Sequence, residues 1–191
     1  MSAAPPLSKA EVRRRMPALE LIDDEQIREA TCEITAFAPA YFWTRPGSTS
    51  GYHNAHERGL WAHTLKLATV IERLADSYTE RNLIRAEDID RVHAAAILHD
   101  QRKAGMDGEE TRRDHDLRMG QLVADEMGDA IVARLVEEHM GPWNDGPPPQ
   151  SPRAELLHQA DMIASDDNCD IDLPGPVPDE LQQFGYEEAN L

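Results

Sequence analysis

Histidine and aspartate side chains recur where the sequence pattern predicts the buried faces of helices. The segments 60–78, 88–99, 115–128, 129–141 and 153–165 carry apolar residues at helical spacing. Within these stripes or directly after them stand six side chains that can bind metal: His63, His99, Asp100, His115, His139 and Asp161. A buried imidazole or carboxylate is costly unless it is paired or bound to a metal. One such residue alone would indicate a hydrogen-bonded core side chain, but the whole set predicts a shared metal site.

Imidazole and carboxylate ligands together restrict the metal. They suit Mn²⁺, Fe²⁺, Co²⁺, Ni²⁺ or Zn²⁺ better than an ion selected by thiolates, Mg²⁺ is also open, and the spacing does not choose among these ions. We therefore expect one or two divalent metal ions as cofactor. Cys32 and Cys169 are the only cysteines and lie far apart, so neither a disulfide framework nor a zinc ribbon is encoded.

The composition predicts an all-α fold, a compact single-domain helical bundle around the buried site. The 191 residues suffice for one core, and only 5% of them are aromatic. We expect a partly flexible N-terminal extension over residues 1–22, the helical domain over 23–168 and an acidic, proline-containing tail over 169–191. A first helix is predicted over 23–38, and the proline-rich stretch 141–152 is predicted to lack regular structure.

The charge balance limits the partners. Thirty-six acidic residues against nineteen basic ones give a formal net charge of -17, typical of a salt-adapted surface kept soluble by repulsion. Such a surface disfavours duplex nucleic acid, because few cations are available to neutralise phosphates. The sequence also has no apolar stretch near the ~20 residues that span a bilayer and no secretory signal, so we expect a cytoplasmic protein with no membrane partner.

In this order, His63, the doublet His99–Asp100 and Asp161 resemble the ligand set of the HD phosphohydrolase superfamily, whose helical domains hold one or two divalent metals. The segments "GLWAHTLKLA", "LHDQRKAG" and "LLHQADMIA" carry this resemblance, which spans roughly residues 50 to 168. "GYHNAHERGLWAHTL" and "EEHMGPWNDGPPPQSPRAELLHQAD" are similar to the HD-domain 3′→5′ exoribonucleases and their single-domain relatives. The chain departs from that branch at Met140, where a second histidine is frequent, and at Arg102, where glycine is frequent.

The segment "WNDGPPP" is also similar to the cyclic-dinucleotide phosphodiesterase branch. The glycine-tyrosine-proline signature of that branch is absent, so its substrate is not assigned.

The resemblance implies roles for the individual residues. His63, His99, Asp100 and Asp161 would bind the first metal, and Asp100 would bridge to a second one. Asp100 and Lys103 would be catalytic, with Lys103 binding the phosphate. His115 and His139 match positions that supply a second metal in dinuclear relatives, although hydrogen bonding around the first site would explain them equally well.

Four further residues are candidates for supporting roles. Arg102 could bind substrate or lie in solvent, and His158, three residues before Asp161, could support the ligands from behind. His53 and His56 stand in the loop before the helix of His63, where they could contact substrate, transfer a proton or simply be exposed.

The leading functional interpretation is a metal-dependent phosphohydrolase, either a phosphomonoesterase or a phosphodiesterase, acting on a small phosphorylated substrate such as a nucleotide or short oligonucleotide. A di-iron oxygenase on the same fold is the first alternative, which His115 and His139 keep open. A non-catalytic metal or nucleotide sensor is the second, and the intact ligand set disfavours it.

Overall fold

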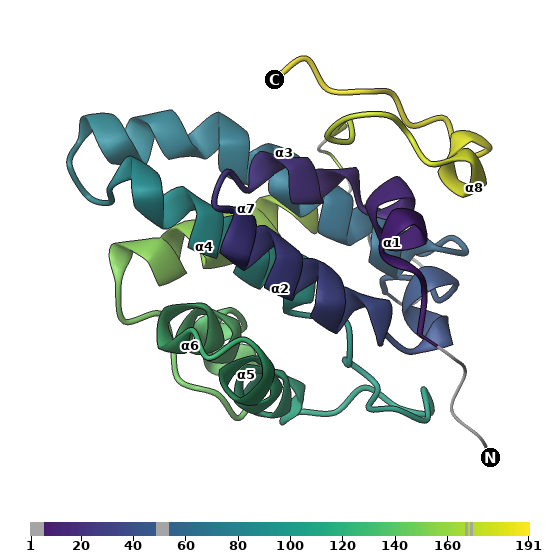
Figure 1. Ribbon diagram of the computed structural model, residues 1–191, viewed down its shortest axis with the longest axis horizontal. Helices are drawn as coiled ribbons and strands as arrows, with labels where there is room; N and C mark the ends of the chain where they lie inside the picture. The colour runs from purple at the N-terminus through teal and green to yellow at the C-terminus, as the bar shows by residue number, and fades with distance from the viewer. Residues whose placement is uncertain (1–5, 49–53, 167, 169) are drawn as a thin grey trace.

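The structure, a computed structural model that describes residues 6–48, 54–166, 168 and 170–191, consists of helices joined by loops (Figure 1). No β-strand occurs in these ranges, where the only β contact is an isolated bridge between Leu173 and Glu188. The predicted all-α class is confirmed. None of the helices in the described part of the chain is both long and apolar enough to cross a bilayer.

The α-helices of the described residues are α1 (Lys9–Arg15), α2 (Glu25–Ala36), α3 (Gly59–Glu80), α4 (Ala86–Leu98), α5 (His115–Glu126), α6 (Ala130–Glu138), α7 (Pro152–Ala164) and α8 (Asp179–Gln182). The 3₁₀ helices are η1 (Pro17–Leu21), η2 (Ala40–Trp43) and η3 (Gly141–Trp143). The helix η3 corrects the expectation that 141–152 has no regular structure. Its proline stands in the first turn, where a missing N–H costs no helical hydrogen bond.

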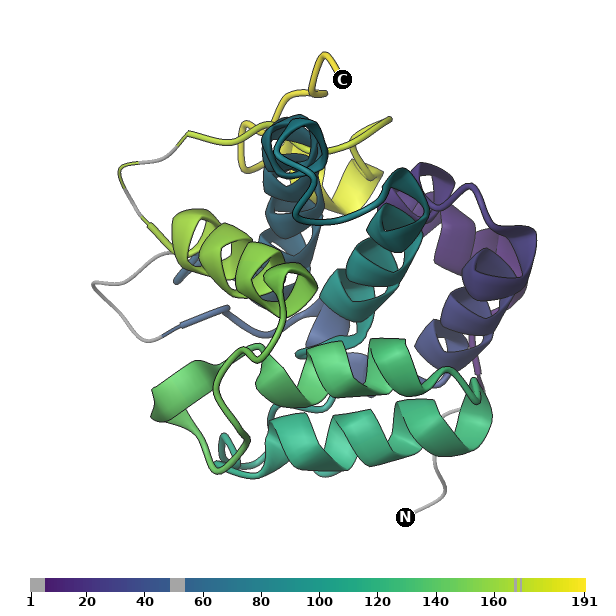
Figure 2. The ribbon, with the colours of Figure 1, turned by 90° about the vertical axis from the view of Figure 1, so that its left-hand side faces the viewer.

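The helix α4 lies at the centre of the molecule and packs against α2, α3, α6 and α7 (Figures 1 and 2). Residues 92–101 are buried without interruption. Three of them are consecutive alanines, Ala94 to Ala96, whose small side chains let neighbouring helices approach closely on several sides. The helix begins at Ala86, earlier than the predicted segment 88–99. Asp88 lies in its first turn and accepts the Arg85 N–H at 3.1 Å.

The first and last described segments of the chain pack on this bundle. Before residue 23, α1 and η1 place Val12, Met16, Leu19 and Ile22 fully inside the same core. After residue 169, Ile171, Leu173 and Leu181 are buried in it as well. An ion pair between Arg14 and Glu180, 2.6 Å apart, joins the two terminal segments. The N-terminal stretch and the tail therefore contribute to the hydrophobic core around the helical domain.

This packing predicts that the N-terminal segment is needed for stability. Leu19→Ala should lower the free energy of unfolding by ~2–5 kcal/mol, because it leaves a cavity in a closed core. Leu83→Ala, at a leucine that is 40% exposed, is the matched control and should change stability by less than about 1 kcal/mol. Urea unfolding followed by circular dichroism measures both. Equal stability of the two variants would show that the terminal segment is not part of the folding unit.

Candidate metal centre

The six candidate metal ligands lie on five helices or directly after them. His99 is the C-terminal cap of α4, and Asp100 follows it; both side chains are buried. His63 lies on the buried face of α3, and Asp161 lies on α7. His115 opens α5, and His139 caps α6. The structure therefore brings the six predicted side chains to the interior.

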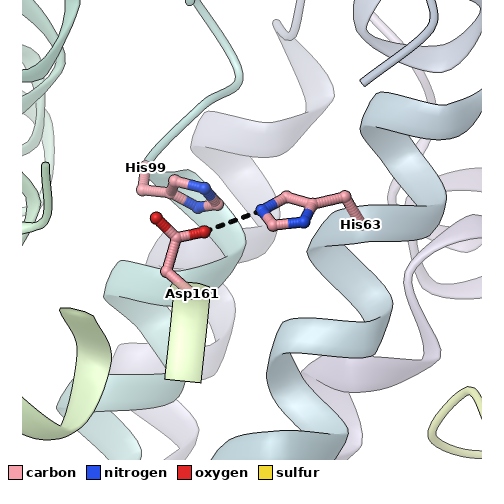
Figure 3. A group of neighbouring side chains, drawn as sticks. All are labelled: His63, His99 and Asp161. Carbon is pink, nitrogen blue, oxygen red and sulfur yellow. Dashed lines mark ion pairs between the residues drawn. The ribbon is translucent and has the colours of Figure 1, made fainter. Parts of the chain in front are cut away.

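His63, His99 and Asp161 form the first group (Figure 3). Figure 3 shows the three side chains converging from α3, the end of α4 and α7. One ligand atom from each lies within 4.8 Å of the other two, and His63 Nε2 is 2.9 Å from Asp161 Oδ1. Two imidazoles and one carboxylate at this spacing can hold one divalent metal ion.

His99 also belongs to a second group, with Asp100 and His139, whose ligand atoms satisfy the same 4.8 Å limit. The Asp100 Oδ1 atom lies 2.9 Å from His115 Nε2 and 3.8 Å from His139 Nε2. Asp100 is therefore placed between the first group and the two additional histidines. His115 and His139 thus both approach the same oxygen of Asp100.

Backbone hydrogen bonds fix which nitrogen each histidine presents. The Nδ1 atoms of His99, His115 and His139 lie 2.7, 2.7 and 2.6 Å from the carbonyl oxygens of Ala96, Arg112 and Val136. A carbonyl can only accept, so each Nδ1 donates, and the neutral ring presents a lone pair at Nε2. The three Nε2 atoms are buried, and none has a hydrogen-bond partner in the described part of the chain.

This orientation fits a metal. The lone pairs at Nε2 face the oxygens of Asp100, and two acceptors that face each other at close range repel unless a cation or a proton lies between them. Histidines that ligate metals commonly donate their other N–H to a carbonyl in this way. The described residues therefore have both the donor types and the tautomers that a divalent cation requires.

The electrostatics of the cluster favour charged carboxylates and a neutral His99. Burial lowers the pKa of His99 to about 4. Burial alone would raise the pKa of Asp100, but Lys103 and the surrounding imidazoles outweigh it and hold that pKa well below the usual range. The pKa of Asp161 is lowered against the effect of burial in the same way, mainly by its hydrogen bond with His63. Both carboxylates are thus anionic at neutral pH.

A cavity of about 600 Å³ opens onto this cluster and exposes part of His63, Asp100 and Asp161. Lys103 also lines it, with Nζ 2.6 Å from Asp100 Oδ2. Burial lowers the pKa of Lys103, but the Asp100 carboxylate more than compensates and raises it, so the ammonium stays charged. Lys103 is therefore a cation beside the ligand cluster that a phosphate entering the cavity can reach.

Two other candidates, Arg102 and His56, lie apart from the ligands. Arg102 borders a separate cavity between α2 and α5, together with Phe37 and Leu122, and does not line the cavity of the ligands. His56 stacks on Phe184 and lies 2.6 Å from the Tyr186 hydroxyl, so it contacts the C-terminal segment and not the cavity.

His53 lies outside the described residues. His158 does line the cavity, and its Nδ1 lies 2.6 Å from the carbonyl oxygen of His139. That hydrogen bond holds the backbone of the candidate ligand His139.

Arg45 and Tyr41 line the cavity as well, and the sequence patterns did not single them out. The Arg45 carbonyl accepts the Leu60 N–H at 3.1 Å, which ties the arginine to the start of α3. That start is tightly packed, because a side chain at Gly59 would meet the Asn54 carbonyl oxygen at 1.8 Å. The sequence did indicate a turn-rich loop just before the helix of His63. Because such a loop is joined to a helix that carries a candidate ligand, its residues could have been expected to border the site.

The HD domain family profile matches residues 60–166, more than half of the chain and all six clustered side chains. The chain belongs to the HD domain family. Searches of the curated proteins and of the solved structures gave no match. The HD domain family is typically composed of metal-dependent hydrolases, and membership implies a divalent metal. In this HD domain protein, the cluster of histidines and aspartates provides candidate ligands for that metal.

Removal of the Asp100 charge should empty the centre without unfolding the HD domain. Asp100→Asn nearly preserves the side-chain volume but removes the carboxylate that offsets the charge of a bound cation, so metal affinity should fall by at least ~10-fold. Metal analysis of protein purified without added metal, and the rise in melting temperature on adding Mn²⁺ or Zn²⁺, both measure this.

His93→Gln is the matched control, because His93 is buried and paired with Glu72 but lies outside the ligand groups. It should keep the metal-dependent rise in melting temperature. Wild-type metal content in Asp100→Asn would contradict the proposed centre.

Proposed function

We propose that this HD domain protein is a metal-dependent phosphohydrolase that acts on a nucleotide or short oligonucleotide. The observation that carries the proposal is the charged Lys103 ammonium beside Asp100, in the same cavity that exposes the metal-ligating carboxylates. A cation next to a metal centre is suited to hold an anionic substrate such as a phosphate ester. A centre without this anion site would suit other metal chemistry as well.

The ligands and the lysine have separate roles. His63, His99, Asp100 and Asp161 would hold one ion, and His115 and His139 with Asp100 would hold a second. A bound divalent metal lowers the pKa of a water and neutralises phosphate charge.

The two carboxylate oxygens of Asp100 have different neighbours. The Oδ1 atom faces His115 and His139, whereas Oδ2 contacts Lys103. Lys103 binds a phosphate oxygen and stabilises the negative charge that grows on it during hydrolysis.

The size of the substrate follows from the cavity and the surface charge. About 600 Å³ lies within the range of pockets that bind small organic ligands. The net charge of -17 repels a long polyanion, whereas a short one needs only the local cations Lys103 and Arg45. These two properties support a small nucleotide over a long polymer.

The di-iron oxygenase is a second candidate, and the approach of His115 and His139 to Asp100 is the observation that favours it. Such an enzyme would bind two irons and consume dioxygen together with an organic substrate. The cation pair in the cavity favours the hydrolase, because oxygen activation has no need of an anion site.

Substitution of Lys103 separates phosphate binding from metal binding. Lys103→Ala should retain metal yet lose roughly 10²–10³-fold in kcat/KM, since a donor to the developing charge is removed. Phosphate release from a panel of nucleotides by the metal-loaded protein measures the loss. Arg102→Ala, one residue away but in another cavity, is the control and should keep activity. The proposal fails if no nucleotide releases phosphate while the protein carries two irons and consumes dioxygen.

A further inference from the structure

One part of the substrate cavity is apolar and open to solvent. It is formed by Met140 and Trp143, where α6 passes into η3, and by Met162 of α7, one residue after the ligand Asp161. Trp143 is 66% exposed and Met162 is 50% exposed. The three side chains thus line the same cavity as the metal ligands without being buried against the core.

The exposure of Trp143 is unusual within this chain. The other two tryptophans, Trp43 and Trp61, are buried and stack edge to face with ring centroids 5.3 Å apart. An indole left in solvent beside a cavity forgoes the gain in free energy that burial would give. On a protein with a net charge of -17, an aromatic ring and two thioethers at one cavity indicate a surface that a ligand covers.

The polar part of the cavity comes from different elements. Lys103 follows α4, and Arg45 follows η2. The Arg45 guanidinium donates to the carbonyl oxygens of Gly108 and Glu109, and no carboxylate lies within 4.0 Å of it among the described residues. The positive charge of Arg45 is therefore left for an anion in the cavity. The cavity combines two cations and the metal ligands with an apolar aromatic surface.

We propose that Trp143, flanked by Met140 and Met162, binds the base of the substrate by stacking, so that the site selects phosphate esters of a nucleoside over aliphatic phosphate esters. The proposal rests on the phosphohydrolase function and names its specificity-determining residue. Aromatic side chains stack on the flat face of any base, and thioethers pack against aromatic edges. Stacking is tolerant of base identity, so discrimination should lie between nucleotide and sugar phosphate, not between purine and pyrimidine.

Fluorescence tests the contact without requiring turnover. A phosphonate analogue of adenosine 5′-monophosphate, added to the metal-loaded protein, should quench the emission of the exposed Trp143. Ribose 5-phosphate should leave that emission unchanged. In Trp143→Phe the quenching should disappear, because the two remaining tryptophans are buried. Quenching that persists in Trp143→Phe, or none in the wild type at saturating analogue, would overturn the proposal.

Kinetics test the consequence for selectivity. Trp143→Ala should raise KM for adenosine 5′-monophosphate by ~5- to 100-fold, because stacking contributes ~1–3 kcal/mol per base. The KM for ribose 5-phosphate should stay within about twofold of the wild-type value, and Trp143→Phe should restore the nucleotide KM. Phe37→Ala is the matched control, since Phe37 is also an exposed aromatic side chain, 59% exposed, but borders the separate cavity of Arg102.

The two proposals fail differently. An equal rise in KM for both substrates, or no rise for either, would overturn the role of Trp143 and leave the hydrolase function intact. Absence of phosphate release from every substrate, with specific quenching by the nucleotide analogue, would overturn the hydrolase function and retain the base-binding surface.

Discussion

The burial of the Asp100 carboxylate among nitrogen lone pairs is the constraint on which the rest of the structure depends. An isolated carboxylate in the interior costs several kcal/mol. Here one oxygen contacts Lys103, and the other faces two imidazoles whose protons are donated elsewhere. A positive charge at the centre of this arrangement would stabilise it further. A divalent cation provides that charge and is stabilised by the same groups in return.

Helix packing and local hydrogen bonds position the side chains of this cluster. The alanine-rich helix α4 can lie in the middle of the bundle because many of its side chains are small. His99 and Asp100 follow its last residue, Leu98, and meet candidate ligands from α3, α7 and the end of α6 there. Each of three histidines donates Nδ1 to the carbonyl three residues before it, a bond available at the end of a helix or turn. The ring orientation and the tautomer are therefore set by the backbone, independently of the metal.

The sequence predicted those parts that depend on periodicity. Helical spacing gave the inward faces of α3 and α4, and hence His63 and His99, because one face of a helix must be buried. It did not predict Arg45 or Trp143, since residues in loops have no period and their positions follow from tertiary packing. Arg102 illustrates the same limit. It stands next to Lys103 in the sequence, yet the turn after α4 directs the two side chains into different cavities.

The metal centre can be tested by an anomalous-scattering crystal structure of the protein loaded with Mn²⁺ or Zn²⁺. We expect an ion within bonding distance, ~2.0–2.6 Å, of His63, His99, Asp100 and Asp161, with a second ion, where present, beside His115 and His139. Anomalous peaks confined to surface carboxylates, with none among these side chains, would contradict this expectation.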